Sequence, residues 1–189
     1  MPRADDIHVL PPDLPEPVDD GAADHLPGMR MPAVALPSTA GREVRLDEQP
    51  GRVVVFCYPR TGRPGEELPA GWNDIPGARG CTPETCGFRD RHGPFAELGV
   101  RLFGLSTQET EYQREMVERL DVPFEVLSDA ELRLTRALPL PTFELDGMTL
   151  LNRITLVIDD GAIEHVFYPV FPPDTHAAAV LDWLAAQVD

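Results

Sequence analysis

Two cysteines separated by four residues, Cys81 and Cys86, are the residues of this sequence best suited to covalent chemistry. Thr82 and Pro83 follow the first cysteine, and both are typical of a helix start, where the missing N–H of proline costs nothing. We therefore expect Cys81 at the entrance of a helix, with unpaired N–H groups and the positive end of the helix dipole directed at it. This environment stabilises a thiolate, which is the nucleophilic form of cysteine. Two buried structural thiols are the alternative.

The composition narrows the possible functions and compartments. A chain of 189 residues is expected to form one domain with a substantial core. Its net charge of -16 argues against nucleic acid or an anionic membrane as a partner, and requires any positive field at the cysteines to be local. Three cysteines form no even disulfide framework, so we expect reactive thiols in a reducing cytoplasm. The sequence shows neither a secretory signal nor an apolar run of roughly 18 residues.

Two segments rich in proline flank the first predicted elements. Residues 1–27 hold six prolines and seven acidic residues against one arginine, which predicts an extended, flexible arm in solvent that precedes a domain at 28–189. Residues 59–80 hold four prolines and five glycines and lead straight into the first cysteine of the pair, so we expect a functional loop. Within it, Trp72 is expected to anchor the loop by packing.

The remaining sequence alternates between predicted strands and helices. In chain order we expect a hairpin at 34–46, a strand at 52–58, an imperfect helix at 82–98, a strand at 100–105, a helix at 106–120, a strand at 124–127, a helix from 128 to Pro139, a hairpin of strands 150–158 and 163–168, and a last helix capped by Asp174. The two middle helices should be capped by Ser106 and Ser128. Alternation followed by an antiparallel pair predicts an α/β fold with a mixed central sheet flanked by helices.

This order, with a cysteine at the helix start after the first central strand, resembles the thioredoxin fold with peroxiredoxin additions. The segment from Gly80 to Asp90 resembles the bacterioferritin-comigratory, or Q-type, branch of the alkyl hydroperoxide reductase/thiol-specific antioxidant family. Four further motifs are similar to that branch: Phe56-Cys57-Tyr58-Pro59, Gly104-Leu105-Ser106-Thr107, Leu127-Ser128-Asp129 and the run from Asn152 to Asp159. The resemblance covers roughly residues 26–188, and the order and spacing of the motifs make it specific.

The resemblance implies a role for five residues. Cys81 would be the peroxidatic cysteine and Cys86 the resolving cysteine. Arg153 matches the family's strand arginine that faces the thiolate, and Glu84 matches the carboxylate that steadies this arginine. Pro59 matches the first residue of the family signature Pro-x-x-x-Thr-x-x-Cys.

The sequence departs from that signature at the threonine. Ala78 stands three residues before the cysteine, and Thr61 is the nearest residue that could supply the hydroxyl. Taken without the resemblance, Arg153 could be a surface cation, and Glu84 could be a first-turn acid favoured by the helix dipole. Cys57 lies inside the apolar strand and is expected to be an inert core thiol.

The resemblance implies a cofactor-free peroxidase that reduces hydrogen peroxide or alkyl hydroperoxides, as a monomer or homodimer. Its sulfenic acid would be resolved to a disulfide and recycled by thioredoxin or a similar dithiol. A disulfide oxidoreductase of thioredoxin fold is one alternative, but such enzymes use C-x-x-C, which this chain lacks. A non-catalytic zinc or partner-binding module is another. His92 could complete a C-x4-C-x5-H cluster, although a fourth ligand is not obvious and no metal is expected.

Helix geometry restricts how the two cysteines could form a disulfide. In a helix, the five residue steps from Cys81 to Cys86 correspond to a rise of about 7.5 Å and a rotation of about 140°, so their Cα atoms lie roughly 8.6 Å apart. A disulfide requires a Cα separation within about 7 Å. The start of the helix must therefore unwind first, and Gly87 lowers the cost because glycine is a poor helix former.

Overall fold

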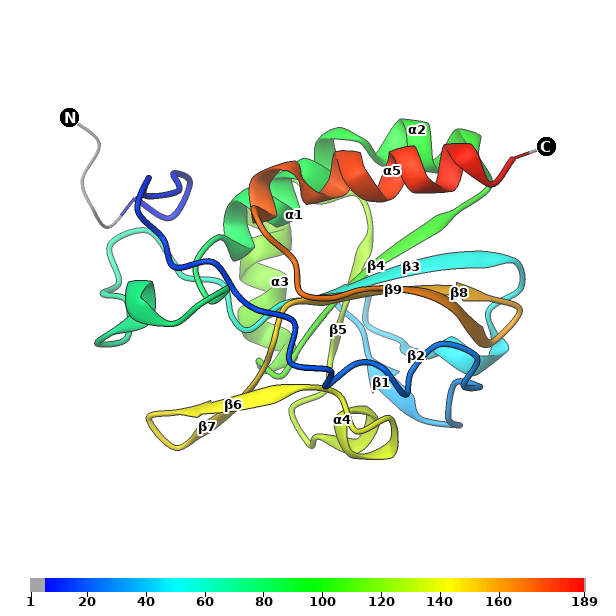
Figure 1. Ribbon diagram of the computed structural model, residues 1–189, viewed down its shortest axis with the longest axis horizontal. Coiled ribbons are helices and arrows are strands. Elements are labelled where there is room, and N and C mark those ends of the chain that lie inside the picture. The colour runs from blue at the N-terminus through cyan, green and yellow to red at the C-terminus, as the bar shows by residue number, and fades with distance from the viewer. Residues whose placement is uncertain (1–5, 189) are drawn as a thin grey trace.

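The computed structural model describes residues 6–188, and a five-stranded sheet lies at its centre (Figure 1). The strand order is β5-β4-β3-β8-β9, with β3 at Arg52–Cys57, β4 at Arg101–Ser106, β5 at Glu125–Ser128, β8 at Ile154–Asp159 and β9 at Ala162–Phe167. β3 pairs in parallel with β4 and antiparallel with β8. The prediction of a mixed central sheet is confirmed.

Two small antiparallel sheets complete the strands. β1 (Ala35–Pro37) and β2 (Glu43–Arg45) form the predicted hairpin. β6 (Thr142–Leu145) and β7 (Met148–Leu151) form a second hairpin that the sequence analysis missed. The prediction of one strand at 150–158 was wrong, because the chain leaves β7 and passes through Asn152 and Arg153 before β8 begins.

The helices are grouped by the face of the central sheet that they cover (Figure 1). α1 (Cys81–Asp90), α2 (His92–Glu97), α3 (Thr110–Arg119) and α5 (His176–Ala186) bury one face, whereas α4 (Arg133–Ala137) and the β1–β2 hairpin pack on the other. Three short 3-10 turns are η1 (Leu46–Glu48), η2 (Trp72–Asp74) and η3 (Pro173–Thr175). Within residues 6–188, the helices are too short or too polar to cross a bilayer.

The predicted helix caps were wrong. Ser106 ends β4 instead of opening α3, and its hydroxyl oxygen accepts a hydrogen bond from Gln113 Nε2 at 2.9 Å. α4 begins at Arg133, later than predicted, because the Asp129 carboxylate accepts the backbone N–H of Thr135 at 2.8 Å. Asp174 lies in η3, and no side chain caps α5. The Ser106 hydroxyl is thus used by a contact with α3, and the Asp129 carboxylate by bonds to the first turn of α4.

β3 sends alternate side chains to opposite faces, as a strand must. Val53, Val55 and Cys57 join the core under α4. Val54 and Phe56, with Tyr58 directly after the strand, join the core that contains Cys81. Cys57 therefore lies on the far side of the sheet from Cys81. It is fully buried, as expected of a core thiol, and burial raises the pKa of this thiol.

The C-terminal half of α1 is fixed in the core by an aromatic stack. The ring of Phe88 lies parallel to that of Phe56 in β3, with centroids 4.3 Å apart. Gly87 contacts the start of α5, since a Cβ placed on it would lie 3.5 Å from the Ala177 Cβ. α1 is thus anchored beyond its second cysteine.

The N-terminal segment differs from its prediction. Residues 6–27 contain no helix or strand, but Ile7, Ala23 and Leu26 are buried. These three side chains are therefore not in solvent, because the domain provides contacts that the composition of the arm does not reveal. The flexibility of the arm stays a prediction. Residues 1–5 lie outside the described part of the chain, and the boundary after residue 27 stays a prediction.

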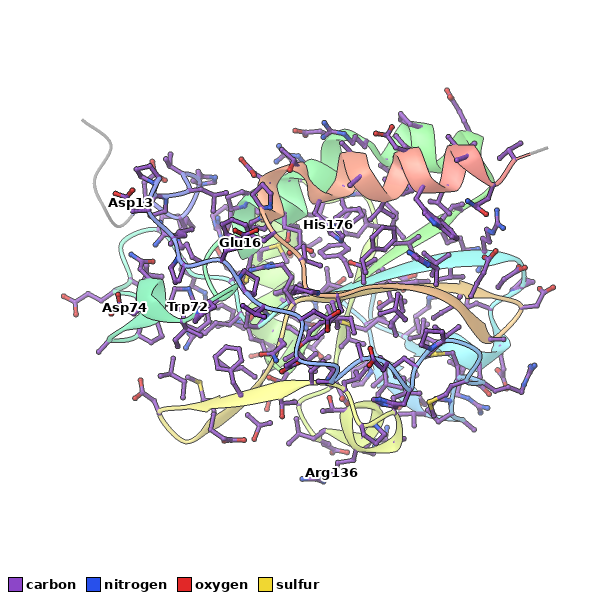
Figure 2. The ribbon with its side chains drawn as sticks, viewed as in Figure 1. Asp13, Glu16, Trp72, Asp74, Arg136 and His176 are labelled. Carbon is purple, nitrogen blue, oxygen red and sulfur yellow. The ribbon has the colours of Figure 1, made fainter. Side chains whose placement is uncertain are left out.

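The loop between β3 and α1 is irregular apart from η2, and it is anchored as predicted. Trp72 is buried and packs in a small cluster with Ala78 and Leu150. Figure 2 shows Trp72 on the same side of the molecule as Asp13 and Glu16 of the N-terminal arm. The loop and the arm are therefore neighbours at the end of the domain where α1 begins.

Gly80 joins this loop to α1 in a conformation that favours glycine. Its φ is +112°, and a Cβ on it would lie 2.3 Å from Pro173 Cγ and 2.9 Å from Leu10 Cδ2. Both the backbone angle and the close packing at the helix start therefore require the absence of a side chain.

We predict that Gly80→Ala lowers the free energy of unfolding more than Gly41→Ala does. Both positions have a positive φ, so each alanine incurs the left-handed cost of about 1–2 kcal/mol. Only Gly80 adds overpacking of about 1–3 kcal/mol, because nothing lies within 4 Å of the Gly41 position. Urea unfolding would measure the difference, and equal losses would contradict the packing argument.

Candidate active site

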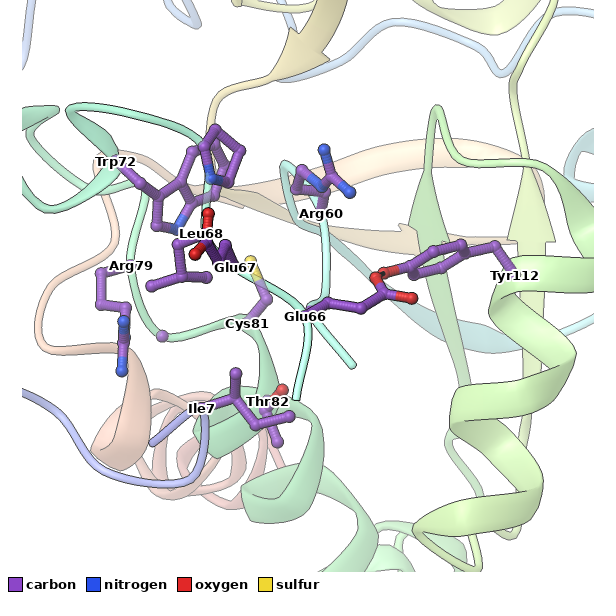
Figure 3. Close-up of a pocket in the computed structure, with 13 residues that line it drawn as sticks. Ile7, Arg60, Glu66, Glu67, Leu68, Trp72, Arg79, Cys81, Thr82 and Tyr112 are labelled. Atoms are coloured by element: carbon purple, nitrogen blue, oxygen red, sulfur yellow. Dashed lines mark hydrogen bonds between the residues drawn. The ribbon is translucent and has the colours of Figure 1, made fainter. Parts of the chain in front are cut away.

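Cys81 is the first residue of α1, and its sulfur faces a small cavity (Figure 3). The side chain is only 4% exposed. The cavity has a volume of about 30 Å³ and is bordered by the loop, α3 and the N-terminal arm, through residues that include Arg60, Leu68, Trp72, Tyr112 and Ile7. Cys81 therefore lies at the entrance of a helix, as expected from the sequence.

The guanidinium of Arg153 contacts the cysteine sulfur. Its Nη2 atom lies 3.3 Å from Cys81 Sγ, 3.0 Å from the carbonyl oxygen of Ala78 and 3.4 Å from that of Arg79. The thiol donates to the same Ala78 carbonyl at 3.7 Å. Two N–H bonds on Nη2 thus face three acceptors, and a deprotonated sulfur would compete directly for one of them.

Glu84 binds the other side of the same guanidinium. Its Oε2 atom forms an ion pair with Arg153 Nη1, and both side chains are buried. Within residues 6–188, neither Glu84 Oε1 nor Arg153 Nε has a hydrogen-bond partner. Burial raises the pKa of Glu84 to about 7, against the opposing effect of Arg153. The structure brings Cys81, Arg153 and Glu84 together, as the resemblance implied.

The pKa of Cys81 results from opposing influences. Burial raises the pKa of this thiol above its ordinary value, and the Glu84 carboxylate adds to the rise. The positive charge of Arg153 is the largest effect that lowers the pKa, and the backbone N–H of Arg60 contributes in the same direction. A thiolate at this position therefore depends on Arg153.

Cys86 lies on the same unbroken helix as Cys81. It is half-buried, burial raises the pKa of its thiol, and all three cysteines of the chain are free thiols. The hydroxyl of Thr85 donates to the Cys81 carbonyl at 2.8 Å and adds to the backbone bonds of this turn. The two sulfur-bearing residues are therefore held five positions apart along an intact helix.

Thr61 does not bring its hydroxyl to the sulfur. The hydroxyl donates to Gln108 Oε1 at 3.3 Å, and the backbone of Thr61 also binds this amide: its N–H donates to Oε1 at 3.0 Å, and its carbonyl accepts from Nε2 at 3.2 Å. Thr61 is buried but does not border the cavity, and neither does Pro59, which is buried directly after Tyr58. The residue that faces the sulfur from this turn is Arg60, through its backbone N–H.

Sequence reasoning missed most of the cavity wall. Tyr112 of α3 donates its hydroxyl to Glu66 at 3.2 Å, and the guanidinium carbon of Arg63 lies 4.1 Å from the centroid of its ring. These contacts tie the long loop to α3. No local pattern marks Ile7 or Leu68 as cavity residues, since both lie in irregular segments rich in proline and acidic residues.

The zinc cluster considered as an alternative is not assembled in the described part of the chain. Residues 6–188 contain no group of three or more His, Cys, Asp or Glu side chains that could hold a metal ion. The ring of His92 lies instead beside Phe124, with centroids 6.2 Å apart.

The sequence is similar to those of several known proteins. The family model described as Redoxin matches residues 26–181. The chain is 32% identical over 158 residues to "Peroxiredoxin Bcp" of Escherichia coli (strain K12), which covers 81% of this chain and 91% of that protein. It is 30% identical over 156 residues to "Peroxiredoxin Q, chloroplastic" of Oryza sativa subsp. japonica. That match covers 82% of this chain but only 64% of the length of the rice protein.

A solved structure gives the same result for the fold. The crystal structure of "Peroxidoxin BcpB" from Mycobacterium tuberculosis superposes with a TM-score of 0.70 at 29% identity, covering 87% of this chain and 100% of that one. The Redoxin match begins at residue 26, so the segment that carries Ile7 lies outside it. Because that match spans most of the chain, and the bacterial relative aligns over nearly its whole length, the chain belongs to the redoxin family, in the Bcp and peroxiredoxin Q branch of the peroxiredoxins.

Proposed function

We propose that the chain is a thiol-dependent peroxidase that reduces hydrogen peroxide and organic hydroperoxides at Cys81. The observation that carries this proposal is the 3.3 Å contact between Arg153 Nη2 and Cys81 Sγ at the start of α1. A cation and a helix N-terminus are both directed at one thiol, and together they favour the nucleophilic thiolate.

The first chemical step is attack of the Cys81 thiolate on one peroxide oxygen. An S–O bond forms, the O–O bond breaks, and the departing oxygen takes up a proton to leave as water or an alcohol. The sulfur is oxidised to a sulfenic acid. Arg153 Nη2 and the backbone N–H of Arg60 are the donors best positioned to stabilise the charge that develops on the oxygens.

The second step joins Cys81 to Cys86. The Cys86 thiol attacks the sulfenic sulfur, an S–S bond forms, and water leaves. We propose that α1 unwinds between the two cysteines for this step, since the reduced structure holds both on one continuous helix.

The cycle closes when an external dithiol reduces the disulfide. We propose a thioredoxin-like protein as this reductant and the cytoplasm as the compartment, because three free cysteines suit a reducing environment. A protein disulfide oxidoreductase is a weaker candidate, because the chain has no C-x-x-C pair.

Cys81→Ser should abolish peroxide consumption in an assay with thioredoxin and its reductase, because serine cannot form the sulfenic acid. Cys57→Ser is the matched control and should retain most of the activity, since Cys57 lies on the opposite face of the sheet. Persistent turnover in Cys81→Ser would refute this assignment of the nucleophile.

Arg153→Met should raise the pKa of Cys81 and slow its reaction with peroxide by about 10²–10³, the loss expected for a single donor to a developing oxyanion. Stopped-flow measurement of the second-order rate constant tests this, with Arg136→Met as the control. That arginine is exposed on α4 (Figure 2), which packs on the opposite face of the sheet from Cys81. Removing one partner of a buried ion pair also destabilises the fold, by about 3–5 kcal/mol.

The double variant Glu84→Gln/Arg153→Met separates these effects, because it leaves no buried carboxylate without its cation. It should be more stable than Arg153→Met while remaining slow with peroxide. A rate constant equal to that of the wild type in either variant would contradict the proposed role of Arg153.

Oxidation to the Cys81–Cys86 disulfide should reduce hydrogen-exchange protection at residues 82–87, while α5 keeps its protection. The reason is that the intact helix separates the Cα atoms by roughly 8.6 Å, too far for the bond. Mass spectrometry would confirm the disulfide in the same sample. Unchanged protection of residues 82–87 with the disulfide present would rule the unwinding out.

A further inference from the structure

The cavity over Cys81 is closed in part by a segment that precedes the Redoxin match. Ile7 borders this cavity together with Cys81 and Thr82, and Figure 3 shows its side chain beside Thr82. Ile7 is 7% exposed although it lies in an acidic, proline-rich arm. An apolar side chain from outside the family region therefore contributes to the wall of the reaction site.

The segment around Ile7 is a hydrogen-bonded turn with a fixed position. The backbone N–H of Val9 donates to the carbonyl of Asp6 at 3.1 Å, and the N–H of His8 donates to the Asp6 carboxylate at 2.9 Å. We refer to residues 6–10 as the arm turn.

Arg79 attaches the arm turn to the start of α1. Its buried Nη2 atom donates to the carbonyls of Asp6 at 2.6 Å and Val9 at 3.3 Å. Leu10, at the end of the turn, packs against Gly80. Because Arg79 and Gly80 directly precede Cys81, the arm turn is positioned relative to the reactive sulfur itself.

The arm turn also packs against the long loop on the other side of the cavity. A Cβ on Gly62 would lie 3.2 Å from Ile7 Cγ2 and 3.7 Å from Leu68 Cδ2. The cavity is partly open to solvent, and its volume of about 30 Å³ is comparable to that of one or two water molecules. Hydrogen peroxide, with two heavy atoms, fits such a space, whereas an aromatic ring does not.

We propose that Ile7 is a size-selecting residue that favours hydrogen peroxide over bulky organic hydroperoxides at Cys81. This inference rests on the peroxidase function proposed above. With the arm turn in place, hydrogen peroxide reaches the sulfur. A hydroperoxide with an aryl substituent next to the O–O group meets the Ile7 side chain and reacts only when the arm turn is displaced.

The test compares the rate constants of Cys81 oxidation by hydrogen peroxide and by cumene hydroperoxide in wild type and Ile7→Ala. Ile7→Ala should raise the cumene hydroperoxide rate constant at least about tenfold, as expected when methylene groups are removed from a restrictive pocket. The hydrogen peroxide rate constant should change by a much smaller factor, so that the ratio of the two rate constants shifts toward cumene hydroperoxide. Val9→Ala is the matched control, because Val9 belongs to the same turn, is 42% exposed and does not border the cavity.

Two results would overturn the inference while leaving the peroxidase proposal intact. One is an unchanged ratio of the two rate constants in Ile7→Ala. The other is an equal increase in Ile7→Ala and Val9→Ala, which would indicate general loosening of the arm. If wild-type Cys81 reacted with neither peroxide, the proposed function would fail, and this inference with it.

Discussion

The active site depends on one buried guanidinium that faces two groups able to carry a negative charge. Arg153 holds Glu84 in an ion pair and also contacts the Cys81 sulfur. Burial raises the pKa of both the Cys81 thiol and the Glu84 carboxyl. The single positive charge of Arg153 therefore stabilises one negative charge at this site better than two. Its bonds to the carbonyls of Ala78 and Arg79 also fix the turn that starts α1. One side chain thus sets both the charge and the position of the sulfur, in a chain whose net charge of -16 offers no general positive field.

The mixed sheet explains how residues 72 positions apart meet. In the antiparallel pair of β3 and β8, Cys57 is opposite Ile154. Arg153 therefore lies level with the residue after β3, at the end of the central strands where the long loop begins. The loop returns to this end of the strands, where α1 starts. A parallel partner in place of β8 would have put the start of that strand at the other end of β3, far from Cys81.

The sequence predicted the α/β alternation, the helix entrance at Cys81 and the packing of Trp72, because these follow from local patterns. It did not predict the β6–β7 hairpin, although Asp146-Gly147 is a strong turn signal, since the apolar run to Ile158 was interpreted as one strand. The sequence also did not predict that the Thr61 hydroxyl, expected near the sulfur, would donate to Gln108, which is distant in the chain. The burial of Ile7 likewise depends on Arg79, and no neighbouring residue indicates it. Contacts between distant segments, not local propensities, decided these cases.

The stack of Phe88 on Phe56 divides α1 into two parts with different mechanical roles. The part up to Gly87 carries both cysteines, whereas the part from Phe88 onward is anchored to the central strand. The proposed opening of the first part would unwind about two turns and separate Glu84 from Arg153 while the Phe88 stack stays in place, so it would be a local event with its own free energy. The chain can therefore gain or lose global stability through core substitutions without a matching change in the ease of helix opening, and evolution can adjust thermal tolerance and turnover independently.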